Sequence, residues 1–125
     1  MGTKSKVSEA QIQASIVELL TLAQNRTPIL FFSIPNEALG RGGRNRAQNA
    51  IRMARFKKMG LLPGAADLVI VHQGEAYFLE VKTPTGRLTE SQKVFASLAI
   101  ECDCSYMVVR SAREAIEALH TWGIV

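Results

Sequence analysis

The sequence is poor in the features of disulfide-rich, secreted and membrane-spanning proteins. It has only 2 cysteines, Cys102 and Cys104, separated by a single residue. This pair builds no disulfide framework and, without histidines nearby, makes a poor zinc site, so we expect two buried, reduced thiols. No apolar stretch approaches the roughly 20 residues that a membrane span needs. No signal-peptide core follows the polar start of the chain, so we expect a cytoplasmic protein.

Motifs of several common enzyme classes are also missing. Gly40, Gly42 and Gly43 form no phosphate-binding fingerprint, because no strand-to-helix turn with a following Lys-Ser/Thr pair accompanies them. No Gly-x-Ser-x-Gly nucleophile motif occurs. His72, in a predicted hairpin turn, and His120 have no carboxylate or second histidine at ligand spacing, so we expect both at the surface.

Acidic residues are absent from one long segment, which concentrates positive charge there. The net charge of the chain is only +4, yet no Asp or Glu lies between residues 41 and 58. The basic residues of this segment are Arg41, Arg44, Arg46, Arg52, Arg55, Lys57 and Lys58. A cluster of one sign suits a polyanion, above all a nucleic acid. The alternative is a solvated helix face that only keeps the protein soluble.

The remaining pattern predicts one domain of mixed helices and strands. The 125 residues fit a single domain over 1–125, and 47% hydrophobic residues suffice for a core. Three capping boxes start at Ser8, Thr89 and Ser111, and apolar periodicity predicts helices at 8–24, 44–59, 89–101 and 111–121. β-Branched and aromatic residues predict strands at 29–34, 67–71, 77–82 and 106–109. This order indicates an α/β fold with a mixed sheet flanked by helices.

A short turn at residues 72–75 sets the register of the two middle strands. With this turn as the hairpin tip, Asp67 falls directly opposite Glu80. Cross-strand neighbours have Cβ atoms about 5 Å apart. Lys82 lies two residues beyond Glu80 and therefore shares its face. The sequence thus places two carboxylates and an ammonium together at one end of the hairpin.

The cluster of Asp67, Glu80 and Lys82 suits metal-dependent hydrolysis. Two neighbouring carboxylates suit a hard divalent cation such as Mg²⁺. A cation there lowers the pKa of a bound water and stabilises charge on a phosphate oxygen. A lysine beside it can orient or deprotonate the attacking water and neutralise developing charge. The alternative is an ion-pair cluster at the sheet edge that binds no metal.

Two further residues have both a site interpretation and a structural one. Glu9 falls on the apolar stripe of the first helix, from which a carboxylate could reach an internal site. It also occupies the first helical position, where the helix dipole favours a negative charge. Gln92 could face the site, but it is also the third residue of a capping box.

Asp67, followed by Glu80-Val81-Lys82 on the next strand, resembles the signature of the PD-(D/E)xK nucleases. More narrowly, the chain resembles the compact, stand-alone phage or bacterial form of the virus-type replication-repair nuclease (VRR-NUC) family. The segments that carry this resemblance are 8–13, 35–37, 58–68, 78–83 and 86–92. One departure is Ala66, which stands before Asp67 where the family usually has proline.

The resemblance implies a restriction-endonuclease-like PD-(D/E)xK core and a set of site residues. Asp67 and Glu80 would be metal ligands, with the Val81 carbonyl as an additional one. Lys82 would be the catalytic lysine. Glu9 would be a carboxylate that joins the metal site from the helix, and Gln92 a supporting site residue.

The resemblance also implies a substrate and partners. It implies a homodimeric DNA endonuclease that uses Mg²⁺ or Mn²⁺. Its substrate would be a four-way junction or other branched DNA. Its setting would be the cytoplasm of a bacterial host, in a phage or prophage context. The basic residues between 41 and 58, with Arg87, would hold the phosphate backbone. The alternatives are a non-catalytic DNA-binding module that keeps the nuclease fold and a restriction-type, sequence-specific endonuclease.

Overall fold

The computed structural model describes residues 6–35 and 45–125. In chain order its helices and strands are α1 (Glu9–Ala23), β1 (Leu30–Ser33), α3 (Arg46–Lys58), β2 (Leu68–His72), β3 (Glu75–Val81), α4 (Glu90–Glu101), β4 (Ser105–Val109) and α5 (Ala112–Thr121). Their order is the predicted one, and each predicted boundary agrees within two residues. None of the helices in the described part of the chain is both long enough and apolar enough to cross a membrane.

The four strands form one mixed sheet in the order β1-β2-β3-β4. β1 and β2, and β2 and β3, pair antiparallel, whereas β3 and β4 pair parallel. The β2–β3 turn has positive φ at Gln73 (49°) and Gly74 (81°), which is the requirement of a type I′ hairpin turn. The register runs from His72 opposite Glu75 to Leu68 opposite Leu79, as the turn predicted.

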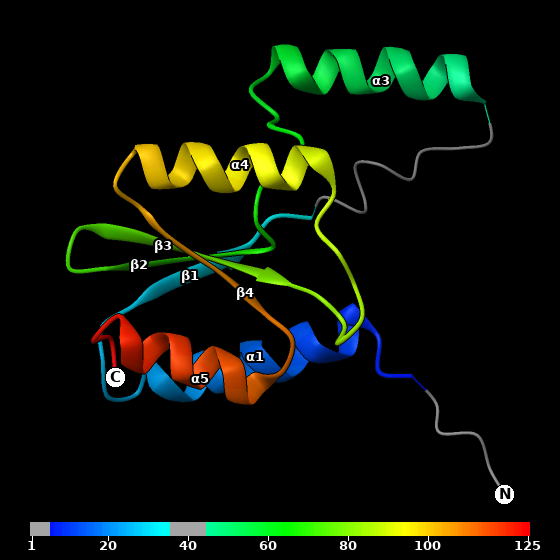
Figure 1. The fold of residues 1–125 in the computed structure, drawn as a ribbon. Coiled ribbons are helices and arrows are strands. Elements are labelled where there is room, and N and C mark those ends of the chain that lie inside the picture. The colour runs from blue at the N-terminus through cyan, green and yellow to red at the C-terminus, as the bar shows by residue number, and fades with distance from the viewer. Residues whose placement is uncertain (1–5, 36–44) are drawn as a thin grey trace, which may run out of the picture.

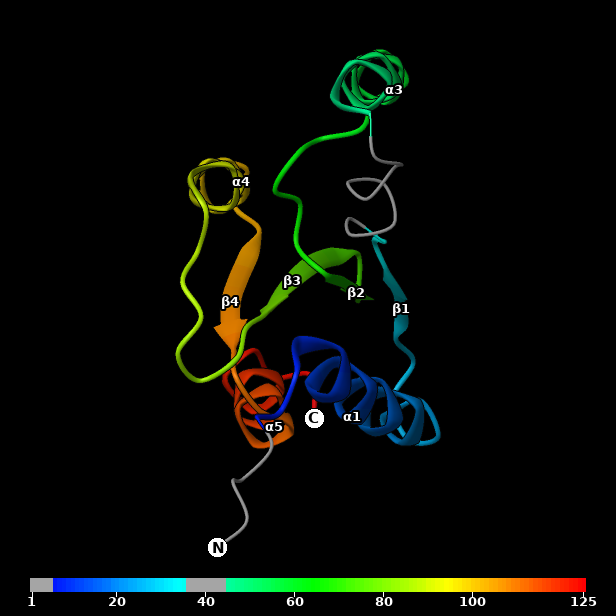
Figure 2. The same cartoon turned by 90° about the vertical axis from the view of Figure 1, so that its right-hand side faces the viewer.

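Helices cover the sheet on both faces. α1 and α5 lie side by side against one face, and α4 lies against the other (Figures 1 and 2). The larger core lies under α1 and α5 and is built from Ile12, Ile16, Leu20, Leu68, Ile70, Tyr77, Leu79, Val81, Val109, Ala115, Ala118, Leu119 and Ile124. The smaller core lies under α4 and contains Ala65, Ala66, Phe95 and Ala99. Strands that are apolar on both faces belong inside such a sandwich.

Two of the three predicted capping boxes are complete. Ser8 and Thr89 each accept a hydrogen bond from the backbone of the residue three positions on, whose glutamine side chain bonds back. The third predicted capping box, at Ser111, is wrong in one of its two hydrogen bonds, the one from the Ser111 N–H to the Glu114 side chain. Ser111 accepts from Glu114 N, but the Glu114 carboxylate accepts from Arg110 N, one residue before the cap. Ser111 is more extended, with φ −162°, than the caps Ser8 (φ −84°) and Thr89 (φ −74°).

Helix α3 stands apart from the rest of the molecule. It lies beyond α4 on the side away from the sheet (Figure 2), and none of its residues is buried. Its apolar stripe of Ala47, Ala50, Ile51 and Ala54 is exposed. The helix is stabilised locally instead. Asn45 caps its start, and Gly60 (φ 101°) ends it with the paired backbone bonds of a Schellman motif.

Two surface predictions need correction. His72 is only 8% exposed, because the alternation of β2 puts it on the same face as Leu68 and Ile70, the face covered by α1 and α5. His120 is exposed, as predicted. Both cysteines are free, as predicted, but neither is buried: Cys102, the C-cap of α4, is exposed, and Cys104 is half-buried.

Candidate active site

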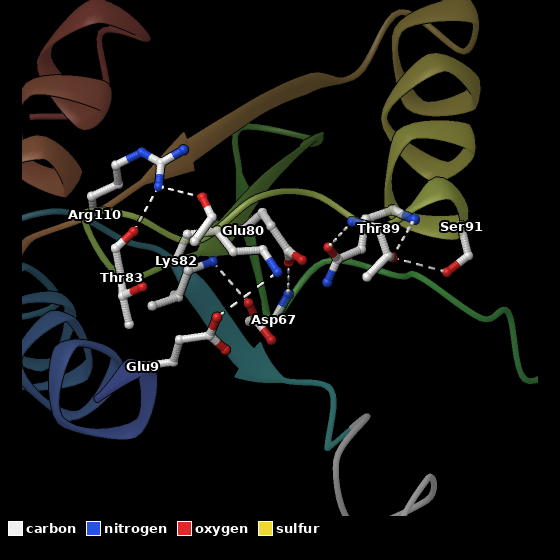
Figure 3. Close-up of polar contacts among 11 residues, drawn as sticks. Glu9, Asp67, Glu80, Lys82, Thr83, Thr89, Ser91 and Arg110 are labelled. Carbon is white, nitrogen blue, oxygen red and sulfur yellow. Dashed lines mark hydrogen bonds and ion pairs between the residues drawn. The ribbon is translucent and has the colours of Figure 1, made fainter. Parts of the chain in front are cut away.

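Asp67 and Glu80 are locked together at the open end of the β2–β3 hairpin. The backbone N–H of Asp67 donates to Oε2 of Glu80 over 3.3 Å, and the N–H of Val81 donates to Oδ2 of Asp67 over 2.7 Å (Figure 3). Asp67 also accepts a hydrogen bond from Ile34 N at its carbonyl, over 2.9 Å, which ties it to the end of β1. Both carboxylates therefore accept hydrogen bonds from backbone N–H groups across the hairpin end, where the predicted register placed Asp67 opposite Glu80.

The segment before Asp67 explains why this residue reaches its position. Gly64 has φ 82°, and a Cβ there would lie 2.3 Å from the carbonyl of Ser91 at the start of α4. Only glycine permits such an approach together with this conformation. Ala65 and Ala66 then pack in the smaller core, and Ala66 is fully buried. Small residues at 64–66 thus pin the entry of β2 against α4.

Burial and charge act together on Glu80. Its side chain is only 1% exposed, and its Oε1 has no hydrogen-bond partner within residues 6–35 and 45–125. Burial, followed by a hydrogen bond with the Asp67 side chain and its negative charge, raises the pKa of Glu80 to about 9. The positive charge of Lys82 and the hydrogen bond from the Asp67 backbone act in the opposite direction. Without a cation, Glu80 therefore keeps its proton at neutral pH, and a bound cation would reverse this effect.

Lys82 connects the carboxylate pair to helix α1. It is 7% exposed, and its N–H donates to the carbonyl of Val109 over 3.0 Å, which extends the pairing of β3 with β4. Its Nζ lies 3.8 Å from Oε1 of Glu9, an ion pair rather than a short hydrogen bond (Figure 3). Buried ammonium groups persist where carboxylates pair with them. The structure therefore brings Glu9 to the cluster through Lys82.

A groove gives a second link between Glu9 and Asp67. The two carboxylates line the same open groove of about 700 Å³, together with Gln13, Ile34 and Pro35. The groove runs between α1 and the end of β1, so it reaches Asp67 from solvent. A substrate group of the size of a nucleotide would have access to Asp67 by this route.

The residues present fit a small divalent cation. Within the described part of the chain, no group of three or more His, Cys, Asp and Glu forms a ready-made metal cage. Mg²⁺ does not require one, because it is commonly held by one or two carboxylates and completed by water and phosphate oxygens. Asp67 and Glu80 supply such a pair, and the unpartnered Oε1 of Glu80 is a free acceptor within it. Val81 follows Glu80 in β3, and its role as a carbonyl ligand stays a prediction.

Gln92 is held by its helix cap. Its Oε1 accepts from Thr89 N over 2.8 Å, and its N–H donates to Oγ1 of Thr89 over 3.3 Å. The start of α4 packs against Gly64, three residues before Asp67, through the backbone of Ser91. The capping interpretation is therefore confirmed, and a supporting role of Gln92 in the site stays a prediction.

The predicted phosphate-binding residues fall into three groups. Arg46, Arg52, Arg55, Lys57 and Lys58 all lie on α3. Arg87 is exposed in the loop between β3 and α4. Arg41 and Arg44 lie outside the described residues.

Arg110 is a residue that the sequence interpretation missed. Its Nη1 donates to the carbonyls of Thr83 and Gly86, over 2.6 and 2.7 Å (Figure 3). It thereby clamps the turn that follows Lys82. The signal was present but indirect: Arg110 directly follows a predicted strand, and parallel strands bring such an end alongside the end of β3.

Comparisons with known proteins agree with this architecture. No family model matches the sequence, and no curated protein is similar to it. A solved structure described as "VRR_NUC domain protein" superposes with a TM-score of 0.65 at 16% sequence identity, over 93% of this chain and 88% of that chain. At this identity the likeness concerns the fold. The chain therefore has the fold of the VRR-NUC domain, a PD-(D/E)xK-like mixed sheet flanked by helices.

Proposed function

We propose that this chain is a nuclease, and specifically an Mg²⁺- or Mn²⁺-dependent DNA endonuclease that hydrolyses phosphodiester bonds. The observation that carries the proposal is the hydrogen-bonded pair of Asp67 and Glu80 with the buried Lys82 beside it. The pair lies in a fold shared with a protein described as a VRR_NUC domain protein. An open groove lined by Glu9 and Asp67 also leads to the cluster, and a purely structural ion-pair cluster would not require such a groove.

Asp67 and Glu80 would hold the cation, with Val81 and Glu9 as further ligands in our proposal. When bound, Mg²⁺ or Mn²⁺ would supply Lewis-acid stabilisation of phosphate charge and a water of lowered pKa. The protein's own part is to fix the two carboxylates before substrate arrives. Because backbone N–H groups hold both carboxylates, little reorganisation is needed.

Lys82 would act on the reacting phosphate and water. Its ammonium is nearly excluded from solvent, where its charge acts more strongly than at the surface. It would orient the attacking water and neutralise charge that develops on the phosphate oxygens. Glu9, with its Oε1 3.8 Å from Nζ of Lys82, would hold the lysine side chain beside the carboxylate pair. Gln92, at the start of α4, would support this arrangement.

The basic residues would hold the DNA backbone. Arg46, Arg52, Arg55, Lys57 and Lys58 of α3, with Arg87 and with Arg41 and Arg44, would contact phosphates. Such contacts bring affinity and a strong dependence on salt but no reading of sequence. We therefore propose a structure-selective enzyme, with four-way junctions or other branched DNA as substrate. Its setting would be the bacterial cytoplasm, in a phage or prophage context.

A homodimer would complete this proposal. A four-way junction has two-fold symmetry, and a C₂ dimer would place one active site on each of two strands. A chain of 125 residues also has little surface of its own for such a substrate. Sedimentation of the chain with and without a junction would test this part separately from cleavage.

The deciding experiment is cleavage of labelled four-way junction, flap and linear duplex DNA with Mg²⁺, Mn²⁺ or EDTA. Wild type is compared with Asp67→Asn, which keeps an oxygen that can accept from Val81 N. Metal-dependent cutting that the variant loses supports the nuclease, and paired symmetric nicks confined to the junction support the branched substrate. DNA binding without cutting of any substrate would favour the non-catalytic binding module, and cutting at one duplex sequence would favour a restriction-type enzyme.

A further inference from the structure

Two buried oxygens near the site have no partner. Within the described ranges 6–35 and 45–125, the buried side-chain atoms without a hydrogen bond are Oε1 of Glu80 and the hydroxyl of Tyr106. Leaving a buried polar group unsatisfied costs about 1–3 kcal/mol. Native proteins therefore rarely leave such atoms alone without a reason. One of these atoms is an acceptor and the other is a donor.

The sheet places these two side chains on one face. In the parallel pairing of β3 with β4, Tyr106 lies opposite Phe78, and Glu80 lies opposite Val108. Because side chains alternate with a period of two, Tyr106 and Glu80 project from the same side as diagonal neighbours. Diagonal neighbours lie about 7–8 Å apart at Cα, within reach of an aromatic side chain.

Electrostatics gives a separate indication of their proximity. The pKa of Tyr106 is raised above its ordinary value, by burial first and then by the negative charges of Glu80 and Asp67. The hydroxyl therefore lies within the field of the carboxylate pair. A phenol with a raised pKa also stays protonated, so it remains a hydrogen-bond donor at any pH at which the protein would work.

We propose that Tyr106 is a positioning residue of the candidate site, and that its hydroxyl donates to Oε1 of Glu80 through one water molecule. A single water can accept from the phenol and donate to one lone pair of Oε1, which gives the hydroxyl a partner and leaves the second lone pair of Oε1 for the cation. The inference rests on the proposed function, because it makes Tyr106 the group that orients a metal-holding carboxylate. Carboxylates that hold metals are generally hydrogen-bonded in turn, and loss of that partner costs about 10–100-fold in metal affinity or activity.

A purely structural role for Tyr106 makes a different prediction. Its ring packs in the smaller core, with its centroid 6.0 Å from that of Phe95. Tyr106→Phe keeps this ring and removes only the hydroxyl. If packing were the whole role, the substitution would be neutral or stabilising, because it removes an unsatisfied buried group. Tyr77→Phe is the matched control, since Tyr77 is a buried strand tyrosine on the opposite face, with its hydroxyl bonded to Glu75.

The test measures Mn²⁺ binding to the whole chain by isothermal titration calorimetry without DNA, then the Mg²⁺ concentration for half-maximal cleavage. We expect Tyr106→Phe to raise the Kd for Mn²⁺ about 10-fold and to raise the Mg²⁺ requirement in parallel. Tyr77→Phe should leave both unchanged. The free energy of unfolding is also measured with urea in EDTA for Tyr106→Phe, Glu80→Gln and the double variant. The effect of the double variant should differ from the sum of the two single effects.

The outcomes separate this inference from the proposed function. An unchanged Kd in Tyr106→Phe, or an equal rise in Tyr77→Phe, overturns the role of Tyr106 while the metal site stands. Wild type that binds no Mn²⁺ overturns the metal site, and this role of Tyr106 with it. Wild type that binds Mn²⁺ but cuts no DNA overturns the nuclease proposal, while the Kd values still decide the role of Tyr106.

Discussion

The end of the β2–β3 hairpin and helix α3 are built on opposite principles. At the hairpin end, Glu80 and Lys82 are buried, Asp67 and Glu9 are half-buried, and the charged groups are held by hydrogen bonds and an ion pair between segments. On α3, no residue is buried and the basic side chains project from a helix that local capping stabilises. The difference suggests a division of labour in which the hairpin end fixes a reaction geometry and α3 contributes charge. Substitutions should therefore separate catalysis from DNA affinity.

The largest effect is expected at Lys82. We expect Lys82→Met to lower the rate of cleavage by about 10²–10³-fold, the usual loss when one group that stabilises transition-state charge is removed. DNA affinity should stay close to that of wild type, because Lys82 is buried and is not one of the exposed basic residues of α3. Single-turnover cleavage and filter binding measure the two quantities. Lys93→Met, at an exposed lysine paired with Glu90, is the control. Normal cleavage by Lys82→Met would remove Lys82 from the mechanism.

The complementary effect is expected on α3. The triple variant Arg55→Ala, Lys57→Ala, Lys58→Ala should fold normally, since none of these side chains is buried. Each lost phosphate contact should reduce the slope of log affinity against log salt by about 0.9. At 0.15 M salt this slope corresponds to about 5-fold in affinity for each contact. Cleavage at saturating DNA should be unchanged. An unaltered salt slope would show that α3 does not contact the backbone.

A third variant tests whether the rigidity of the hairpin end extends to the turn after Lys82. Arg110→Ala leaves the carbonyls of Thr83 and Gly86 without their guanidinium donor. We expect a loss of about 2 kcal/mol in the free energy of unfolding, because these are hydrogen bonds from a charged group. Arg113→Ala, at an exposed arginine of α5, should cost almost nothing. Urea denaturation compares the two variants. An equal loss in the free energy of unfolding for both would show that the hydrogen bonds of Arg110 do not stabilise the turn.

The last prediction concerns a pH dependence of stability that arises at the hairpin end. The folded chain raises the pKa of Glu80 from 4.5 to about 9, so it binds this proton more tightly than the unfolded chain does. The resulting stability is fully present below about pH 4.5 and is lost as pH rises toward 9. Metal-free wild type should therefore lose stability over this interval, and Glu80→Gln should lose less. Thermal unfolding in EDTA at several pH values measures the stability of both proteins. Parallel profiles of stability against pH for wild type and Glu80→Gln would contradict this prediction.

Local signals predicted the parts of the site that depend on neighbours in sequence. The turn at Gln73–Gly74 sets a register within 14 residues, so Asp67 could be placed opposite Glu80. The caps of α1 and α4 are likewise local. The contact of Lys82 with Glu9 required only that the apolar stripe of α1 face the sheet.

Tertiary packing decided the rest. The contact of Arg110 with Thr83 depends on parallel pairing between strands separated by a helix, which no local pattern encodes. The burial of His72 depends on how far α1 and α5 extend over the sheet. The exposed apolar stripe of α3 has a typical amphipathic sequence, yet the described residues offer nothing for it to pack against.

The parallel pairing of β3 with β4 also has a consequence for how the site is assembled in time. The β2–β3 hairpin closes over a short loop, and hairpins of this kind form within about 1–10 μs. Tyr106 and Arg110 reach the hairpin only after the chain has crossed over through α4. The contacts of these two residues with the hairpin span a much greater sequence separation and therefore form more slowly. The carboxylate pair would thus form early, and the groups that orient it and clamp the following turn would dock late.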